Sequence, residues 1–369
     1  MPDCYIGLMS GTSLDGVDGV LVDFSTAAPR VLAHAAAPFP SALRAELFAL
    51  NRSGPDELHR AALAANGLMR QYAAVVAELL RASRIEASGI RAIGAHGQTV
   101  RHRPQEFDGT GYTLQLCQPA LLAELTGIDV VADFRSRDVA AGGQGAPLAP
   151  FFHQALYGQR QEAVGVLNIG GIANVTLLRP DGSMLGFDCG PGNALMDGWC
   201  ARHIGQPYDA DGAWAAGGRV LPQLLAALLA EPYFAKAPPK STGRDLFDLE
   251  WVDGRLRGCD APAPADVQAT LAELTATACS REVLRHEPAL SRLIVCGGGA
   301  LNGHLMRRLA ALLPQAAVAS SADVGLPPLQ VEATAFAWLA RKTVRREPLQ
   351  LQSITGARGA RVLGGIYLA

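Results

Sequence analysis

The sequence predicts an α/β protein of two domains, each with a sheet covered by helices. Segments with strand character alternate along the chain with segments of helical spacing, as is typical of this class. The chain has 369 residues, more than one hydrophobic core usually serves, so two domains are expected. Three glycine-rich turns follow short apolar runs, in the segments 5–20, 166–178 and 293–303. The first two have the order strand, turn, strand, which is consistent with one module used twice.

The remaining elements follow from local patterns. The segment 5–20 is expected to form a hairpin with a hydroxyl-rich tip, and 40–84 carries helical spacing with Ser53 and Asp56 as possible caps. Further expected elements, in order, are a strand and loop at 90–100, a helix and strand at 119–134, strands within 164–188, a helix from Asn193 to Gly205, an amphipathic helix at 266–286, a buried strand at 293–296 and a helix at 332–344.

Composition narrows the function classes. The net charge of −2 provides no broad basic field for nucleic acid or an anionic membrane surface. No apolar run reaches the length of a membrane span, and the segment around Asp3 does not resemble a signal peptide. The 7 cysteines are scattered and form no CxxC pair, which argues against a zinc site. We therefore expect a soluble, cytoplasmic protein that binds neither nucleic acid nor membrane.

The generic nucleotide motifs are absent. The chain has no GxxxxGK[ST] sequence, which excludes a P-loop, and no GxSxG elbow. The nearest match to GxGxxG, at 297–302, ends in Asn and argues against a dinucleotide site. Each glycine turn taken alone is equally compatible with a purely structural role.

Longer motifs in combination are more specific. They run nearly end to end, and the main ones are GLMSGTSLDGVD (7–18), GAHGQTV (94–100), TGIDVVADFRSRDVAAGGQGAPLAP (126–150), NIGGIANVT (168–176), GFDCGPGNALMD (186–197), DGAWAAGG (211–218), PKSTGRDLF (239–247) and VCGGGALN (295–302). With these motifs the chain resembles the actin/Hsp70/hexokinase superfamily, in which two ribonuclease-H-like lobes hold ATP in a cleft between them. Within it, the chain resembles the anhydro-N-acetylmuramic acid kinase family.

The resemblance implies a reaction and an organisation. The family opens the 1,6-anhydro ring of 1,6-anhydro-N-acetylmuramic acid with water and phosphorylates O6, using ATP and Mg²⁺, in peptidoglycan recycling and amino-sugar catabolism. It also implies a homodimer, and two lobes: 1–131 with about 350–369, and 132–349. Two alternatives remain open, namely a conventional sugar kinase acting on a free hydroxyl, and an actin-like or Hsp70-like nucleotide switch.

Asp188 is the expected catalytic base. Water must be driven onto the anomeric carbon, which requires a carboxylate at the sugar, while the departing O6 is captured by the γ-phosphoryl group and needs no acid. Asp188 ends a strand, where α/β sheets bind ligands, and it occupies the position of the family's catalytic Asp. The alternative is that Asp188 caps the helix that starts at Asn193.

The glycine turns are expected to bind ATP. Backbone amides and hydroxyls of the first turn suit the β- and γ-phosphates, and Asp15 could hold Mg²⁺ through water. The expected ATP-binding residues are Gly11, Thr12, Ser13, Leu14, Asp15, Gly16, Val17, Asp18, Gly170, Gly171, Gly297, Gly298, Gly299 and Asn302. Asp15 and Asp18 could instead be solvated at a plain hairpin, and the last glycines could serve only close packing.

Four residues are expected to contact the sugar. His96 and Gln98 could donate to sugar oxygens, and the Arg135 guanidinium suits the lactyl carboxylate of muramic acid. Glu332 opens the late helix, and the resemblance suggests a contact with a sugar hydroxyl. His96 and Arg135 could instead be a core histidine and a surface charge. The segment 240–245 is interpreted either as a loop over the nucleotide or as an ordinary helix entry.

Overall fold

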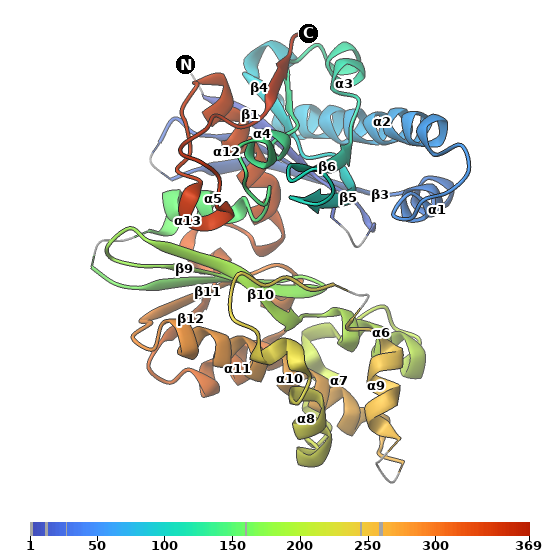
Figure 1. The fold of residues 1–369 in the computed structure, drawn as a ribbon, viewed down its shortest axis with the longest axis vertical. Coiled ribbons are helices and arrows are strands. Elements are labelled where there is room, and N and C mark those ends of the chain that lie inside the picture. The colour runs from blue at the N-terminus through green and yellow to red at the C-terminus, as the bar shows by residue number, and fades with distance from the viewer. Residues whose placement is uncertain (1–2, 12–13, 27, 159–160, 244–245, 258–260) are drawn as a thin grey trace. The chain divides into compact units, whose positions relative to one another are not determined.

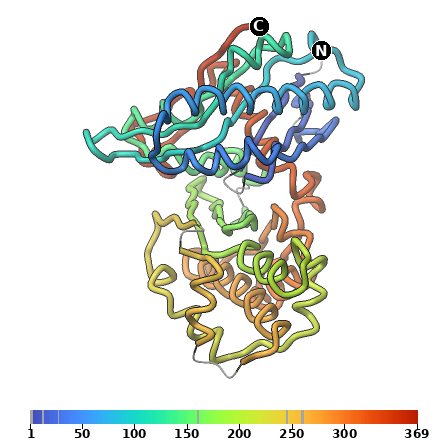
Figure 2. The backbone as a smooth tube through the Cα atoms, turned by 90° about the vertical axis from the view of Figure 1, so that its right-hand side faces the viewer, coloured from blue at the N-terminus to red at the C-terminus, as the bar shows by residue number. Residues whose placement is uncertain are grey.

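The computed structural model describes residues 3–11, 14–26, 28–158, 161–243, 246–257 and 261–369. It forms two compact units, Met1–Phe152 with Gln330–Ala369, and His153–Leu329. Both units combine a sheet with helices, which confirms the expected α/β class (Figure 1). Residues 132–152 and 330–349, expected in the second lobe, belong to the first unit. Figure 2 shows the red C-terminal segment lying among the blue N-terminal elements of that unit.

The first unit is built on a six-stranded sheet in the order β13-β7-β4-β1-β2-β3. Strands β1, β2 and β3 are antiparallel neighbours, whereas β4 and β7 run parallel to β1. The strands are β1 Cys4–Met9, β2 Gly16–Asp23, β3 Arg30–Pro38, β4 Ala92–Ala95, β7 Val130–Ala132 and β13 Gly365–Tyr367, and a separate hairpin joins β5 Gln98–Pro104 to β6 Gly111–Leu116.

Helices cover both faces of this sheet. The helices are α1 Ser41–Ala49, α2 Glu57–Ser83, α3 Pro119–Thr126, α4 Ser136–Ala140, α5 Ala149–Tyr157 (which continues past the end of the unit), α12 Val331–Val344 and α13 Gln352–Thr355. Ile6 and Leu8 of β1 lie in one core with Val75 and Leu79 of α2. Because side chains alternate along a strand, Gly7 lies on the opposite face, against α12.

Two glycines explain why α12 belongs to this unit although it comes late in the chain. A Cβ added at Gly7 would lie 1.9 Å from the Ala333 carbonyl oxygen, and one added at Gly94 would lie 2.1 Å from the Phe336 carbonyl oxygen. The backbone of α12 therefore lies directly on β1 and β4, at a distance that only glycine permits.

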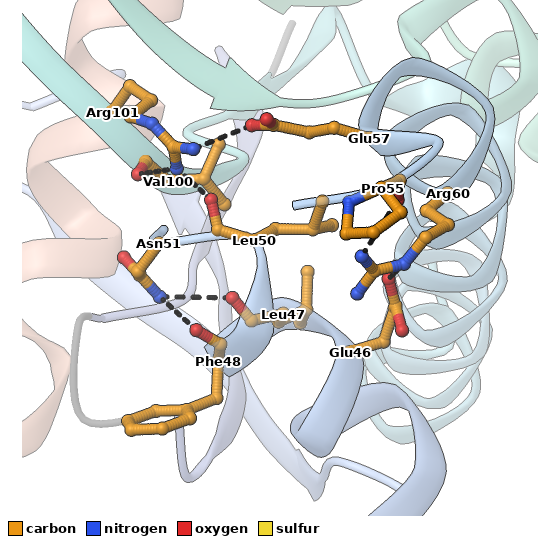
Figure 3. Close-up of polar contacts among 10 residues, drawn as sticks. All are labelled: Glu46, Leu47, Phe48, Leu50, Asn51, Pro55, Glu57, Arg60, Val100 and Arg101. Atoms are coloured by element: carbon orange, nitrogen blue, oxygen red, sulfur yellow. Dashed lines mark hydrogen bonds and ion pairs between the residues drawn. The ribbon is translucent and has the colours of Figure 1, made fainter. Parts of the chain in front are cut away.

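An arginine attaches the β5 strand to the helices beside it (Figure 3). Arg101 donates from Nη2 to Oε1 of Glu57 at 2.6 Å and from Nη1 to the carbonyl oxygen of Leu50. Asn51 donates to the carbonyls of Leu47 and Phe48 at 3.0 and 3.3 Å, which satisfies the end of α1. The contacts of Arg101 fix β5, whose first residue is the predicted sugar ligand Gln98.

The second unit repeats the sheet of the first. Its five strands have the order β10-β9-β8-β11-β12, with three antiparallel neighbours followed by two parallel additions. The first unit has the same order in β3-β2-β1-β4-β7, so the module suspected from the sequence does occur twice. The strands are β8 Val164–Ile169, β9 Ile172–Leu178, β10 Met184–Pro191, β11 Arg292–Cys296 and β12 Ala317–Ser320.

Helix α10 is the centre of the second core. Its 23 residues are mostly buried, and they lie with Phe187 of β10 and Val175 of β9 in one apolar cluster. The helices of this unit are α6 Ala194–Ile204, α7 Ala213–Ala216, α8 Pro222–Leu229, α9 Leu249–Leu256, α10 Pro264–His286 and α11 Gly303–Leu312. Within the described ranges, no helix is both long and apolar enough to cross a membrane.

Gly94→Ala should destabilise the first unit. Its new Cβ meets backbone rather than a flexible side chain, so we expect a loss of about 1–3 kcal/mol or more. Gly67→Ala is the control, because a Cβ in the middle of α2 has its nearest neighbour at 3.4 Å and should stabilise the helix by about 1 kcal/mol. The measurement is the urea midpoint of unfolding, and a Gly94→Ala midpoint equal to wild type would contradict the close approach of α12.

Candidate active site

In the first unit, three parallel strands end at the same edge of the sheet. Strands β1, β4 and β7 run in one direction, so the residues that follow them lie together. These residues include three groups predicted from the sequence: the first glycine turn after Met9, His96 after Ala95, and Arg135 after Ala132. The edge therefore gathers the predicted phosphate and sugar contacts of this unit.

The described residues on either side of the tip of the turn between β1 and β2 are joined by a hydrogen bond. The Leu14 N–H donates to the Gly11 carbonyl at 3.2 Å, and Leu14 is buried with a positive φ of 58°. The Asp15 side chain is exposed. The predicted ATP ligands Thr12 and Ser13 lie outside the described residues.

Three residues assigned to the ATP turn lie within β2. The backbones of Gly16, Val17 and Asp18 pair in register with β3. The Val17 side chain is in the core, whereas Asp18 is exposed and its carboxylate lies 3.6 Å from Nε2 of His34. A Cβ at Gly16 would lie 2.2 Å from the Ala37 carbonyl oxygen, so this glycine serves the strand pairing.

Gln98, the first residue of β5, links that strand to the first glycine turn. Its side chain is 1% exposed, and Nε2 donates to the carbonyl oxygen of Gly11 at 3.1 Å. The Oε1 atom is buried, with no hydrogen-bond partner in the described part of the chain. Gln98 therefore fixes the first turn and retains an acceptor.

His96 and Arg135 form a direct pair. Arg135 donates to Nε2 of His96 from Nη2 at 3.0 Å and from Nε at 3.3 Å, and from Nη1 to the Gly145 carbonyl at 2.8 Å. Burial, assisted by the positive charge of Arg135, lowers the pKa of His96 to about 3. The imidazole is thus neutral, and since Nε2 accepts, its proton lies on Nδ1. His96 orients the guanidinium of Arg135.

Arg135 also lies within the field of two carboxylates. Burial lowers the pKa of Arg135 to about 10, while the negative charges of Glu332 and Asp138 oppose that shift. Glu332 is the second residue of α12 and has an exposed side chain. His96, Arg135 and Glu332, which were predicted separately from distant motifs, are therefore neighbours within this unit.

Asp138 holds the loop on which Arg135 depends. Its fully buried carboxylate accepts from the Gly145 N–H at 2.6 Å and from the Thr355 hydroxyl at 2.5 Å. The Gln144 N–H donates to the Thr355 carbonyl at 2.8 Å. The C-terminal segment thus fixes the loop whose Gly145 carbonyl accepts from Arg135. Nothing in the sequence motifs indicated the pairing of Asp138 with Thr355.

Thr355→Val should loosen this loop. The substitution keeps the shape but leaves a buried Asp138 oxygen without its donor, which should cost about 1–3 kcal/mol. We expect faster amide hydrogen exchange at Gln144 and Gly145, while Thr355→Ser, which keeps the hydroxyl, should exchange like wild type. Equal exchange in the Val variant would mean that Asp138 does not depend on Thr355.

In the second unit, the Gly170–Gly171 turn receives the start of α6. The N–H of Asn193 donates to the Gly170 carbonyl at 2.7 Å, and the N–H of Gly192 donates to the Gly171 carbonyl at 2.9 Å. The Asn193 side chain donates to the Ile169 carbonyl at 3.0 Å. Backbone carbonyls thus receive these N–H groups, and no side-chain cap, Asp188 included, bonds the start of α6.

The third glycine turn lies beside the second. Cβ atoms at Gly297 and Gly299 would lie 2.3 Å from Oδ1 of Asn168 and 2.4 Å from Cγ2 of Ile169. Asn302 accepts from the Leu305 N–H at 3.0 Å and so caps α11. Close packing and capping, the structural alternatives for this turn, are therefore present, and they bring it next to the end of β8.

Asp188 lies on the edge strand β10 of the second sheet. Its carboxylate accepts from the Thr242 N–H at 3.0 Å, and no other donor among the described residues bonds it. Its own N–H donates to the Lys240 carbonyl at 3.2 Å, and its carbonyl accepts from the Tyr233 hydroxyl at 2.8 Å. The backbone is held on both sides, while the carboxylate has one bond.

Burial raises the pKa of Asp188 to about 6, against the opposing hydrogen bond from Thr242. A carboxyl group with this pKa is ionised near neutral pH and is more basic than a solvated one. It can therefore accept a proton from a bound water or hydroxyl.

Two asparagines that sequence reasoning missed share the face of Asp188. Asp188 pairs with Asn174, which in turn pairs with Asn168, so the three half-buried polar side chains form a row across β10, β9 and β8. Phe187, one residue away, points into the α10 core on the other face. The sequence contained a signal for this row. Asn168 and Asn174 lie in the strands on either side of the Gly170–Gly171 turn, an even number of residues apart.

Among the described residues, no group of three or more His, Cys, Asp or Glu side chains gathers that could hold a metal ion. Mg²⁺ bound to a nucleotide usually keeps several waters and takes one or two carboxylates, so it needs no such group. The exposed Asp15 at the end of the first turn fits a water-mediated contact of this kind.

The repeated sheet order, with glycine turns at the strand ends, defines the actin/hexokinase-type ATPase fold. A solved structure titled "Reductive activator for corrinoid, iron-sulfur protein" is similar in fold, with a TM-score of 0.51 at 13% sequence identity, over 96% of this chain and 63% of that one.

Sequence comparison is more specific. The anhydro-N-acetylmuramic acid kinase family profile matches residues 3–369. Anhydro-N-acetylmuramic acid kinase from Albidiferax ferrireducens is 64% identical over the whole of both chains, and that from Variovorax paradoxus is 64% identical over 100% of this chain and 99% of that one. The chain belongs to the anhydro-N-acetylmuramic acid kinase family.

Proposed function

We propose that this protein opens the 1,6-anhydro ring of 1,6-anhydro-N-acetylmuramic acid with water and phosphorylates O6 from ATP. The products are N-acetylmuramic acid 6-phosphate and ADP, and the reaction serves peptidoglycan recycling. Family membership over the full length supports this function over a conventional sugar kinase or a nucleotide switch. The observation that carries the mechanism is the half-buried Asp188 carboxylate, which accepts one N–H, from Thr242, among the described residues and has a raised pKa.

Asp188 acts on water. It takes a proton from the water molecule whose oxygen forms a bond to the anomeric carbon, and the bond from that carbon to O6 breaks. The released electron pair on O6 attacks the γ-phosphorus, and ADP departs with the electrons of the broken P–O bond. The proton on Asp188 then passes to solvent. One carboxylate suffices because the phosphoryl group captures O6.

The glycine turns bind the nucleotide. In this proposal, backbone N–H groups of the first glycine turn and of Gly170–Gly171 bind phosphate oxygens, and the turn at Gly297–Gly299 with Asn302 binds the adenosine. Asp15 would hold Mg²⁺ through water, and the ion would neutralise phosphate charge.

The strand ends of the first unit bind the sugar. Arg135, oriented by His96 and the Gly145 carbonyl, pairs with the lactyl carboxylate. Glu332 contacts a sugar hydroxyl, and the buried Oε1 of Gln98 offers an acceptor. We further propose that the protein is a cytoplasmic homodimer. We also propose that it has no nucleic-acid or membrane partner, because its net charge of −2 provides no broad basic surface for either.

Asp188→Asn should abolish sugar-dependent turnover. The amide cannot accept the proton, so we expect a loss of about 10²–10⁴-fold in kcat. The measurement is ADP release with and without 1,6-anhydro-N-acetylmuramic acid. Turnover that ignores the sugar would contradict the kinase, whereas an active Asp188→Asn would move the base elsewhere.

Activity should fall on the acid side of about pH 6. The pKa of Asp188 is raised, so the basic form is lost as the pH drops below that value, and kcat/KM should decrease tenfold per pH unit. A flat profile between pH 5 and 7 would contradict this role.

The same ionisation affects stability. Since the folded pKa of Asp188 lies above the ordinary value of 3.8, wild type should lose stability relative to Asp188→Asn as the pH rises from about 4 to about 6. Urea unfolding of both proteins at pH 4 and pH 7 provides this independent check.

A further inference from the structure

The segment 240–243 lies along the free edge of β10. This strand is the outermost of its sheet, so one side of its backbone is open to pairing. Lys240 accepts the Asp188 N–H at 3.2 Å, and two residues later the Thr242 N–H reaches the Asp188 carboxylate at 3.0 Å. The segment therefore provides the hydrogen bond that the proposed base receives. Arg244 and Asp245 lie outside the described residues.

The Lys240 side chain points into the protein interior. It is 2% exposed, and its Nζ lies 3.2 Å from Oε1 of Glu282 on α10, which is also 2% exposed. The ammonium group further lies 5.0 Å from the ring centre of Tyr233 and 5.8 Å from that of Phe187. The lysine thus ties the edge segment to the central helix of the unit.

The same cluster holds the other side of Asp188. The Tyr233 ring that contacts Lys240 belongs to the residue whose hydroxyl donates to the Asp188 carbonyl at 2.8 Å. Glu282 is further approached by Arg285 at 3.2 Å and His286 at 3.5 Å. A fully buried ion pair is costly to desolvate and is weak evidence for a role in stability alone.

We propose that Lys240 is a positioning residue whose ion pair with Glu282 fixes the backbone of residues 240–242, so that the Thr242 N–H stays on the Asp188 carboxylate. This inference rests on the proposed function of Asp188 as base. It assigns a role to the KSTG segment that is neither a lid over the nucleotide nor a helix entry.

The physical consequence concerns the ionised form of the base. A hydrogen bond from an N–H favours the carboxylate, so the Thr242 bond offsets part of the burial that raises the pKa of Asp188. If the segment loosens, Asp188 should hold its proton to a higher pH. Among the described residues, the titratable groups that face Asp188 and Lys240 are Tyr233, Cys189, Glu282, Arg285 and His286.

Tyr233 and Cys189 stay neutral in the working range, because burial raises the pKa of Tyr233, and a hydrogen bond with Cys279 together with burial raises that of Cys189. Burial lowers the pKa of His286, which favours its neutral form. Lys240 contributes to that shift of His286, so a direct titration of the Asp188 carboxyl is needed to separate the two groups.

The test is the pH profile of Lys240→Met. We expect the acid limb of kcat/KM to move up by about 0.5–1 pH unit, a three- to tenfold loss at pH 5.5, with the KM for ATP unchanged. Arg308→Met is the matched control, because it breaks an ion pair with Glu273, which lies on α10 like Glu282 but does not belong to the cluster around Lys240. The acid limb of kcat/KM for Arg308→Met should coincide with that of wild type.

Two further sets of variants address misfolding. Lys240→Met/Glu282→Met removes both charges, so it should fold while still shifting the limb, since the tie to α10 is gone. Thr242→Pro removes the N–H and should shift the limb, whereas Thr242→Ala keeps it and should not. A Lys240→Met/Glu282→Met profile that coincides with wild type would overturn the proposal and leave Lys240 with a structural role.

A titration without substrate separates this inference from the proposed function. The ¹³C carboxyl signal of Asp188, assigned by its loss in Asp188→Asn, should titrate at a higher pH in Lys240→Met than in wild type. This result would support the positioning role even if the sugar does not stimulate ADP release. Equal titration in the two proteins would overturn it whatever the activity.

Discussion

The proposed chemistry depends on one electrostatic balance at the edge of a sheet. A carboxylate that activates water must be buried from solvent enough for its pKa to rise, because a higher pKa makes it a stronger base. Its pKa must nevertheless stay low enough for the group to be ionised at the pH of the cell. Burial raises the pKa of Asp188 to about 6, and one backbone N–H, from Thr242, opposes that shift. Because β10 is an edge strand, a loop rather than another strand lies against Asp188. Everything that fixes this loop therefore bears on the base.

The repeated module explains how each unit contributes to the proposed chemistry. In both, three antiparallel strands are followed by two parallel ones, and glycine turns close the ends of the central strands. The first unit adds the His96–Arg135 pair, held through Gly145 by Asp138 and Thr355. The second adds Asp188 and the polar row with Asn174 and Asn168. The same fold thus carries the proposed sugar contacts in one copy and the proposed base in the other.

Patterns local in the sequence predicted much of this arrangement. Apolar runs before glycine turns located the central strands, and the place of Asp188 at a strand end, together with the family resemblance, made it the predicted base. Pairings that join distant segments could not be predicted: Asp138 lies 217 residues from Thr355, and α12 joins the first unit because Gly7 and Gly94 accommodate its backbone. The sequence could not show where the first turn ends and β2 begins, because both lie in one motif. The hydrogen-bond register shows that Val17 belongs to the strand. Nothing local in the sequence indicated that Lys240 pairs with Glu282 of α10.

The most direct test of the central claim, that Asp188 drives water onto the anomeric carbon, follows the oxygen of that water. Turnover of 1,6-anhydro-N-acetylmuramic acid in ¹⁸O-water, quenched early and analysed by mass spectrometry, should place one label on the anomeric oxygen and none on the phosphate. Unlabelled N-acetylmuramic acid 6-phosphate in the same water corrects for exchange at the reducing end. A phosphorylated product without label above this background, or a label in the phosphate, would contradict the account.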